Sequence, residues 1–144
     1  MYKKFALVLS INAVIMFLLT YVMIAEWGHF HFALNRAYMA LLMVAPMAIL
    51  MLLVMRSMYP NGKLNAGLFL GFAMLFVVCF VLVRTQTPIG NEQFLRSMIP
   101  HHSSAILMCE EADLTDPEIA RLCEEIVRTQ KEEIAQMETI LARY

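Results

Sequence analysis

Three long apolar runs without a formal charge constrain the fold of this chain more than any other feature of its sequence. They cover residues 5–25, 37–55 and 64–83, and they are 21, 19 and 20 residues long. A helix needs about 20 residues to cross the hydrocarbon core of a bilayer, and in lipid the backbone must satisfy its own hydrogen bonds. The sequence therefore predicts an all-α protein in which residues 1–87 form a membrane domain with three transmembrane helices.

Charge divides the chain into two parts of opposite sign. Residues 1–84 hold six basic residues and one acidic residue, whereas residues 85–144 hold five basic and 11 acidic ones. Four basic residues share the side of the amino terminus and two lie on the other side; they are Lys3, Lys4, Arg56 and Lys63 against Arg36 and Arg84. This bias predicts a cytoplasmic amino terminus and an exported tail. The acidic tail also argues against a nucleic-acid partner.

Residues 88–144 are predicted to form a second domain, an antiparallel helical hairpin. Apolar residues recur at helical spacing on both sides of a break at residues 113–117, where Asp116 suits the N-cap and Pro117 the first helical position. Two helices alone bury too little surface to be stable. We therefore expect a homodimer through the hairpin that completes a four-helix bundle, with packing on the membrane surface as the alternative.

The first predicted tail helix carries soft metal ligands on one stripe. Met98, His102 and Cys109 fall at offsets that share a helix face, and His101 and Met108 adjoin that face. Thioether, imidazole and thiol groups together favour copper, Cu(I) in particular. The alternative explanation of the two histidines is a polar patch at a helix interface.

An antiparallel register about residues 113–116 brings further ligands from the second helix. It places Cys109 level with Cys123 and the two histidines level with Gln130. Met137 faces the same groove but lies further from the histidines along the second helix. The cysteines then have two explanations that exclude each other, namely thiolate ligation and a disulfide formed in an oxidising compartment. The sequence leaves both open.

Two other patterns contain metal-ligating side chains. His29 and His31 in the first loop suit either an exported metal site or an interfacial position. Methionines recur every four residues from Met39 to Met55, but each step overshoots a helical turn by about 40°, so the row winds around the helix. Packing by flexible side chains is therefore favoured over a metal-conducting stripe.

The chain resembles the family called domain of unknown function 305 (DUF305), and in particular its three-span, membrane-anchored bacterial members. The resemblance rests on Phe94, the run Met98-Ile-Pro-His-His, Ala105, Ile106, Met108, Asp116-Pro117, Gln130, Glu133-Ile134 and Met137. Ser103-Ser104 departs from the residues that often follow the histidine pair, and Cys109 and Cys123 lie outside the usual pattern.

This resemblance implies a ferritin-like helical bundle with copper ligands at Met98, His101, His102, Met108 and Met137. The leading hypothesis is a membrane-anchored protein of the bacterial inner membrane that sequesters or hands on copper in the periplasm. The alternative is a non-catalytic structural or interaction module whose hairpin dimerises or binds other membrane proteins. Two Glu-x-x-His motifs on separate helices of the bundle, a nucleophile motif and a nucleotide-binding motif are all absent, so we expect no enzyme.

Overall fold

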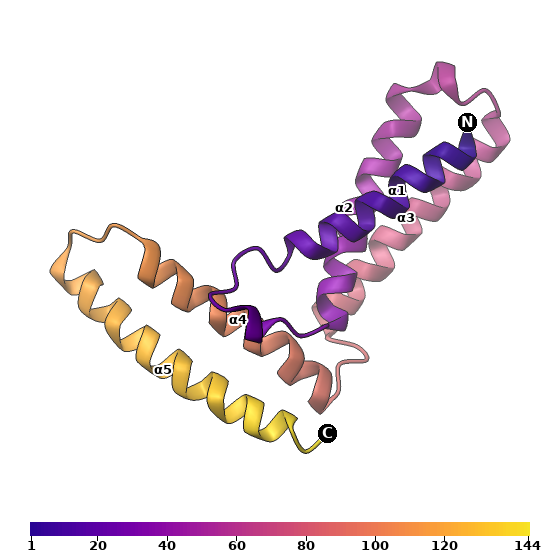
Figure 1. The fold of residues 1–144 in the computed structure, drawn as a ribbon. Helices are drawn as coiled ribbons and strands as arrows, with labels where there is room; N and C mark the ends of the chain where they lie inside the picture. The colour runs from indigo at the N-terminus through magenta and orange to yellow at the C-terminus, as the bar shows by residue number, and fades with distance from the viewer. The chain divides into compact units, whose positions relative to one another are not determined.

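The fold is all-α in a computed structural model that describes all 144 residues (Figure 1). The five helices are α1 (Tyr2–Leu19), α2 (Leu34–Val54), α3 (Gly62–Thr85), α4 (Asn91–Glu111) and α5 (Pro117–Leu141), with single 3-10 turns at Trp27–His29 and Arg56–Met58. The predicted fold class, three apolar helices followed by further helices, is confirmed. The chain divides into two compact units, a membrane unit (Met1–Thr20 and Asn35–Pro88) and a tail unit (Tyr21–Leu34 and Ile89–Tyr144).

Helices α1, α2 and α3 are each long and apolar enough to cross a membrane, which indicates membrane association. The first helix is shorter than its apolar run, because it ends at Leu19 although the run continues to residue 25. Tyr21 explains this early end. Its hydroxyl donates to the backbone carbonyl of His31 at 2.7 Å and accepts the N–H of Ala33 at 3.1 Å. These two bonds hold the segment from Tyr21 to Ala33 as a loop.

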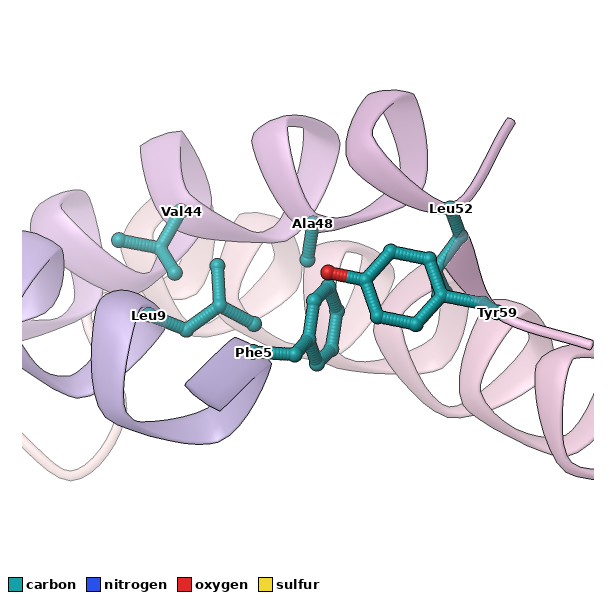
Figure 2. Close-up of a cluster of buried hydrophobic side chains, with 6 residues drawn as sticks. All are labelled: Phe5, Leu9, Val44, Ala48, Leu52 and Tyr59. Carbon is teal, nitrogen blue, oxygen red and sulfur yellow. The ribbon is translucent and has the colours of Figure 1, made fainter. Parts of the chain in front are cut away.

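The membrane unit is held together by a small apolar cluster (Figure 2). Its buried side chains come from α1, from α2 and from the segment before α3; they are Phe5, Leu9, Val44, Ala48, Leu52 and Tyr59. One polar bridge accompanies this cluster, because the Tyr2 hydroxyl donates to Asn65 Oδ1 at 2.8 Å and Asn65 Nδ2 donates to the Tyr59 carbonyl at 2.7 Å.

The methionine row of α2 winds around the helix as its spacing predicts. Met39, Met43 and Met47 are exposed, whereas Met51 and Met55 pack against the apolar cluster of the membrane unit. Packing therefore accounts for the last two methionines of the row, and the row does not form one continuous face.

In the tail unit, α4 and α5 form the predicted antiparallel hairpin (Figure 1). Asp116 is the N-cap of α5, as expected, since its carboxylate accepts the N–H groups of Glu118 at 2.8 Å and Ile119 at 3.3 Å. The apolar core cluster of the hairpin consists of Leu95, Ile99, Ile106, Ile134 and Met137.

The first loop, residues 21–34, is part of the tail unit, although the sequence division at residue 87 grouped it with the membrane domain. Ala25 packs against the hairpin core, and its N–H donates to Ser103 Oγ at 2.8 Å. At the other end of the loop, the N–H of Leu34 donates to Gln93 Oε1 at 2.8 Å. The loop is thus bonded to α4 at two places. A fragment that begins at residue 88 would lack part of this unit.

Candidate metal-binding site

The run Met98-Ile-Pro-His-His occupies the middle of α4, which continues as a helix through Pro100. Ile99 and Ser103 are both fully buried and fix which side of the helix faces inward. His101, two residues after Ile99, is therefore exposed, whereas the side chain of His102 is only 14% exposed. The two adjacent imidazoles, with ring centroids 6.0 Å apart, have different surroundings.

His102 is held by a carboxylate from the facing helix. Its Nδ1 lies 2.9 Å from Oε2 of Glu133, in close polar contact but without the alignment of a regular hydrogen bond. The same carboxylate oxygen accepts the side-chain amide of Gln130 at 3.3 Å. The predicted register placed the histidines level with Gln130, and the observed contact lies about one turn further along α5.

The methionines expected as ligands occupy three different environments. Met98 is half-buried and packs against the hairpin core, and Met137 belongs to that core with 9% of its surface exposed. Met108 is 59% exposed and lies outside the core. The structure therefore brings Met98 and Met137 to one cluster and leaves Met108 apart from it. The spacing along α4 did not reveal this difference in depth.

The two tail cysteines form a disulfide. Cys109 and Cys123 are joined with a Cα–Cα distance of 5.3 Å, which confirms the predicted level register of the two helices. With the sulfur atoms bonded to each other, neither residue is a thiolate, so the alternative of thiolate ligation does not hold in this structure. The remaining soft ligands are imidazoles and thioethers.

The first-loop histidines lie in the same unit as the α4 pair. His29 Nδ1 is 2.8 Å from Ser103 Oγ, the fully buried hydroxyl that also accepts the Ala25 N–H. Burial lowers the pKa of His31 below its ordinary value of 6.5; the positive charges of Arg96 and His29 act in the same direction, and Glu138 opposes them. His31 Nε2 is buried without a hydrogen-bond partner.

Ser103 was not expected to have a role, since the sequence marked it only as a departure from the family pattern. No local signal identifies it, because its partners Ala25 and His29 lie 78 and 74 residues earlier in the chain. No three His, Cys, Asp or Glu side chains are grouped closely enough to hold a metal ion by themselves.

Comparisons with known proteins are consistent with the pattern in α4 and α5. The model of a family described as "Domain of unknown function (DUF305)" matches residues 82–141. The chain is also similar to an uncharacterised protein of Acanthamoeba polyphaga mimivirus, with 34% identity over 116 residues that cover 79% of this chain and 74% of the relative. No solved structure matches the chain.

Proposed function

The chain belongs to the DUF305 family, and we propose that it is a membrane-anchored protein that binds copper and sequesters it or hands it on. The observation that carries the proposal is the arrangement of soft donors along α4. His101 and His102 are adjacent, Met98 lies about one turn before His102, and Met108 lies about two turns after His101. Imidazole and thioether donors together favour copper, and thioethers favour its Cu(I) state.

Copper is the cargo in this proposal, and the candidate ligands differ in whether their donor atoms are accessible and free of other bonds. Nε2 of His102 makes no hydrogen bond, and His101 is exposed, so both imidazoles have a free nitrogen. Met98 supplies the nearest thioether on the same face of α4 as His102. Met108 and Met137 are assigned supporting positions, because one is exposed and the other is packed in the core.

The proposed location is the inner membrane of a bacterium, with the amino terminus in the cytoplasm and the tail unit in the periplasm. The excess of Lys and Arg on the side of the amino terminus supports this orientation. The Cys109–Cys123 disulfide supports it independently, since disulfides persist in oxidising compartments such as the periplasm.

A competition titration of the full-length protein in detergent micelles tests the proposal. Cu(I) is supplied anaerobically as its acetonitrile complex, so that the disulfide stays intact, and a Cu(I) chelator competes for the ion. We expect stoichiometric binding that is tighter than binding of Zn(II), because zinc has no preference for thioethers. The double variant His101→Ala/His102→Ala should lose this binding and keep its helical circular dichroism.

The first-loop pair provides the matched control, since His29→Gln/His31→Gln also removes two imidazoles. Retained Cu(I) stoichiometry in this control assigns the ion to α4. Unchanged stoichiometry in the His101/His102 variant contradicts the proposed site, and so does wild-type binding of Cu(I) that is no tighter than that of Zn(II).

The exposed apolar surface of the hairpin favours a second candidate function, that of a non-catalytic interaction module. Large side chains on both helices stay open to solvent: Phe94 is 51% exposed, Met108 59%, Ile119 48% and Leu122 56%. Such a surface suits a second hairpin, which would give a homodimeric four-helix bundle, or another membrane protein. The module predicts concentration-dependent association in micelles without metal, measured by analytical ultracentrifugation. A monomer at all concentrations contradicts it.

A further inference from the structure

We propose that Glu133 is the positioning residue of the α4 metal site. It holds the His102 ring through Nδ1 and leaves Nε2 as the nitrogen that meets the ion. This inference rests on the proposed function, because it assigns a role to a residue that supports the same site. It also gives His101 and His102 different roles, although their spacing in the sequence does not distinguish them.

The contact between the two helices supplies the geometry. Nδ1 of His102 is buried 2.9 Å from Oε2 of Glu133, without the alignment of a regular hydrogen bond, and no other polar group bonds to it. A small rotation of the Glu133 carboxylate would align this contact as an Nδ1–H donation. An imidazole that donates Nδ1–H to a carboxylate carries its free electron pair on Nε2. Histidine ligands of metals usually have this arrangement, in which a carboxylate fixes the tautomer and the ring orientation and raises the basicity of the ligating nitrogen.

Gln130 extends the arrangement by one further bond. Its side-chain amide donates to Glu133 Oε2, so the carboxylate oxygen that faces His102 is itself held in place. Both residues lie on α5, one turn apart, whereas His102 lies on α4. The site thus spans the hairpin, and the disulfide that joins α4 and α5 keeps the two helices in register.

The sequence neighbours of His102 and Glu133 are His101 and Glu132, and these two residues lack such a contact. His101 is exposed and forms no ion pair with a carboxylate, and its ring and the neighbouring imidazole lie in an edge-type arrangement with centroids 6.0 Å apart. Glu132 points to a different partner, because its Oε1 accepts from Arg128 Nη1 at 3.1 Å, and both of these side chains are more than 60% exposed. Glu132 is therefore a matched control for Glu133, with the same charge and the same helix but no contact with a histidine.

The tautomer of His102 in the metal-free protein tests the proposal without reference to copper. Full-length protein is labelled with ¹⁵N-histidine in micelles, the four histidines are assigned from single His→Gln variants, and long-range ¹H–¹⁵N correlations identify the protonated nitrogen. We expect His102 to carry its proton on Nδ1 in the wild type and in Glu132→Ala. In Glu133→Ala, the ring should move to the Nε2–H form that predominates for free imidazole side chains.

Copper affinity provides the second measurement. Glu133→Ala should weaken Cu(I) binding by about 10- to 100-fold, the usual effect of losing such a partner. Glu133→Gln keeps an acceptor oxygen without the charge and should restore part of the loss, and Glu132→Ala should bind as the wild type does. Glu133 is 51% exposed on a helix surface, so these variants are expected to fold.

The outcomes separate this inference from the proposed function. If the His101/His102 double variant loses copper while Glu133→Ala keeps the wild-type affinity and tautomer, the positioning role is wrong and the copper site stands. If the tautomer changes as expected but no variant alters copper binding, the proposed function is wrong, and the metal-site role of Glu133 is wrong with it. An Nε2–H tautomer of His102 in the wild type contradicts the inference directly.

Discussion

The membrane unit and the tail unit are both built from long helices, yet different forces hold them together. In α3, Cys79 is the only buried residue of 24, and most of the large apolar side chains of the membrane unit face outward. In the tail unit, apolar side chains gather between α4 and α5, while a disulfide and the bonded first loop add to them. Each unit therefore has a buried apolar cluster, but the membrane unit leaves a large apolar surface that suits lipid, whereas the tail unit adds a disulfide and the bonds of the first loop to its cluster. Substitutions should affect the two units differently.

The largest difference is expected from the removal of a core side chain. Ile99 is fully buried in the tail unit, so Ile99→Ala should lower the free energy of unfolding of that unit by about 2–5 kcal/mol, from lost burial and the cavity left behind. Urea unfolding in micelles, followed by amide signals of α4 and α5, measures this change. The control Leu70→Ala removes a 64% exposed side chain of α3 and should change little. Equal losses of unfolding free energy in Ile99→Ala and Leu70→Ala would show that the two units do not differ in this respect.

The disulfide should contribute the next largest effect. Cys109 and Cys123 are 14 residues apart, and a loop of that size restricts the unfolded chain by about 3 kcal/mol. The double variant Cys109→Ser/Cys123→Ser should therefore shift the urea midpoint of the tail unit downward. The membrane unit has only the free thiol of Cys79, so a reductant should reproduce the shift in the tail unit alone. A wild-type midpoint that stays unchanged in reductant would show that the disulfide adds no stability.

The first loop, residues 21–34, comes from the membrane half of the sequence, and we expect its bonds to Ser103 to contribute to the stability of the tail unit. Ser103→Ala removes the hydroxyl that pairs with the Ala25 N–H and with His29 Nδ1, and it leaves both groups without this partner. We expect a loss of about 1–3 kcal/mol in the tail unit. Hydrogen exchange at the Ala25 amide should become faster in the variant. Unchanged protection of this amide would show that the loop is held by other contacts.

A polar bond of the membrane unit should matter less than one of the tail unit. Tyr2→Phe removes the hydroxyl that donates to Asn65 Oδ1 at 2.8 Å and accepts the Asn61 N–H at 3.3 Å, and it keeps the aromatic ring against the cluster. Side-chain hydrogen bonds in membrane proteins contribute about 0.6 kcal/mol each on average, so the loss of these two should cost about 1 kcal/mol. Unfolding of the membrane unit by sodium dodecyl sulfate in mixed micelles measures it. A loss as large as that of Ser103→Ala would remove the contrast between the units.

The sequence predicted those parts of the fold that local pattern determines. Uncharged runs of about 20 residues indicated the three apolar helices, and Asp116 and Pro117 marked the start of α5. The level register of Cys109 and Cys123 followed from two helices joined by a short turn. Each of these inferences depends on neighbours within a few helical turns, where spacing alone carries the information.

The parts that the sequence did not predict depend on contacts between distant segments. The early end of α1 follows from hydrogen bonds of the Tyr21 hydroxyl to residues of the same loop, and the docking of that loop follows from Ser103. In the candidate site, helical spacing placed Met98 and Met108 near one face, but it contains no information about depth. Burial depends on what packs against α4, and the first loop is part of that packing.

His31 offers the smallest expected effect in the tail unit, because its partly buried imidazole makes the stability of that unit depend on pH. Burial and the neighbouring cations Arg96 and His29 lower the pKa of His31 in the folded state, so the unfolded chain binds more protons around and below pH 6.5. Stability should therefore fall as the pH decreases through 6.5 toward the lower folded pKa. His31→Gln removes this proton uptake on unfolding, so its unfolding free energy should fall less between pH 7.5 and pH 5.5 in urea titrations. Wild-type and variant curves that run parallel over this range would show that burial of this ring does not link folding to pH.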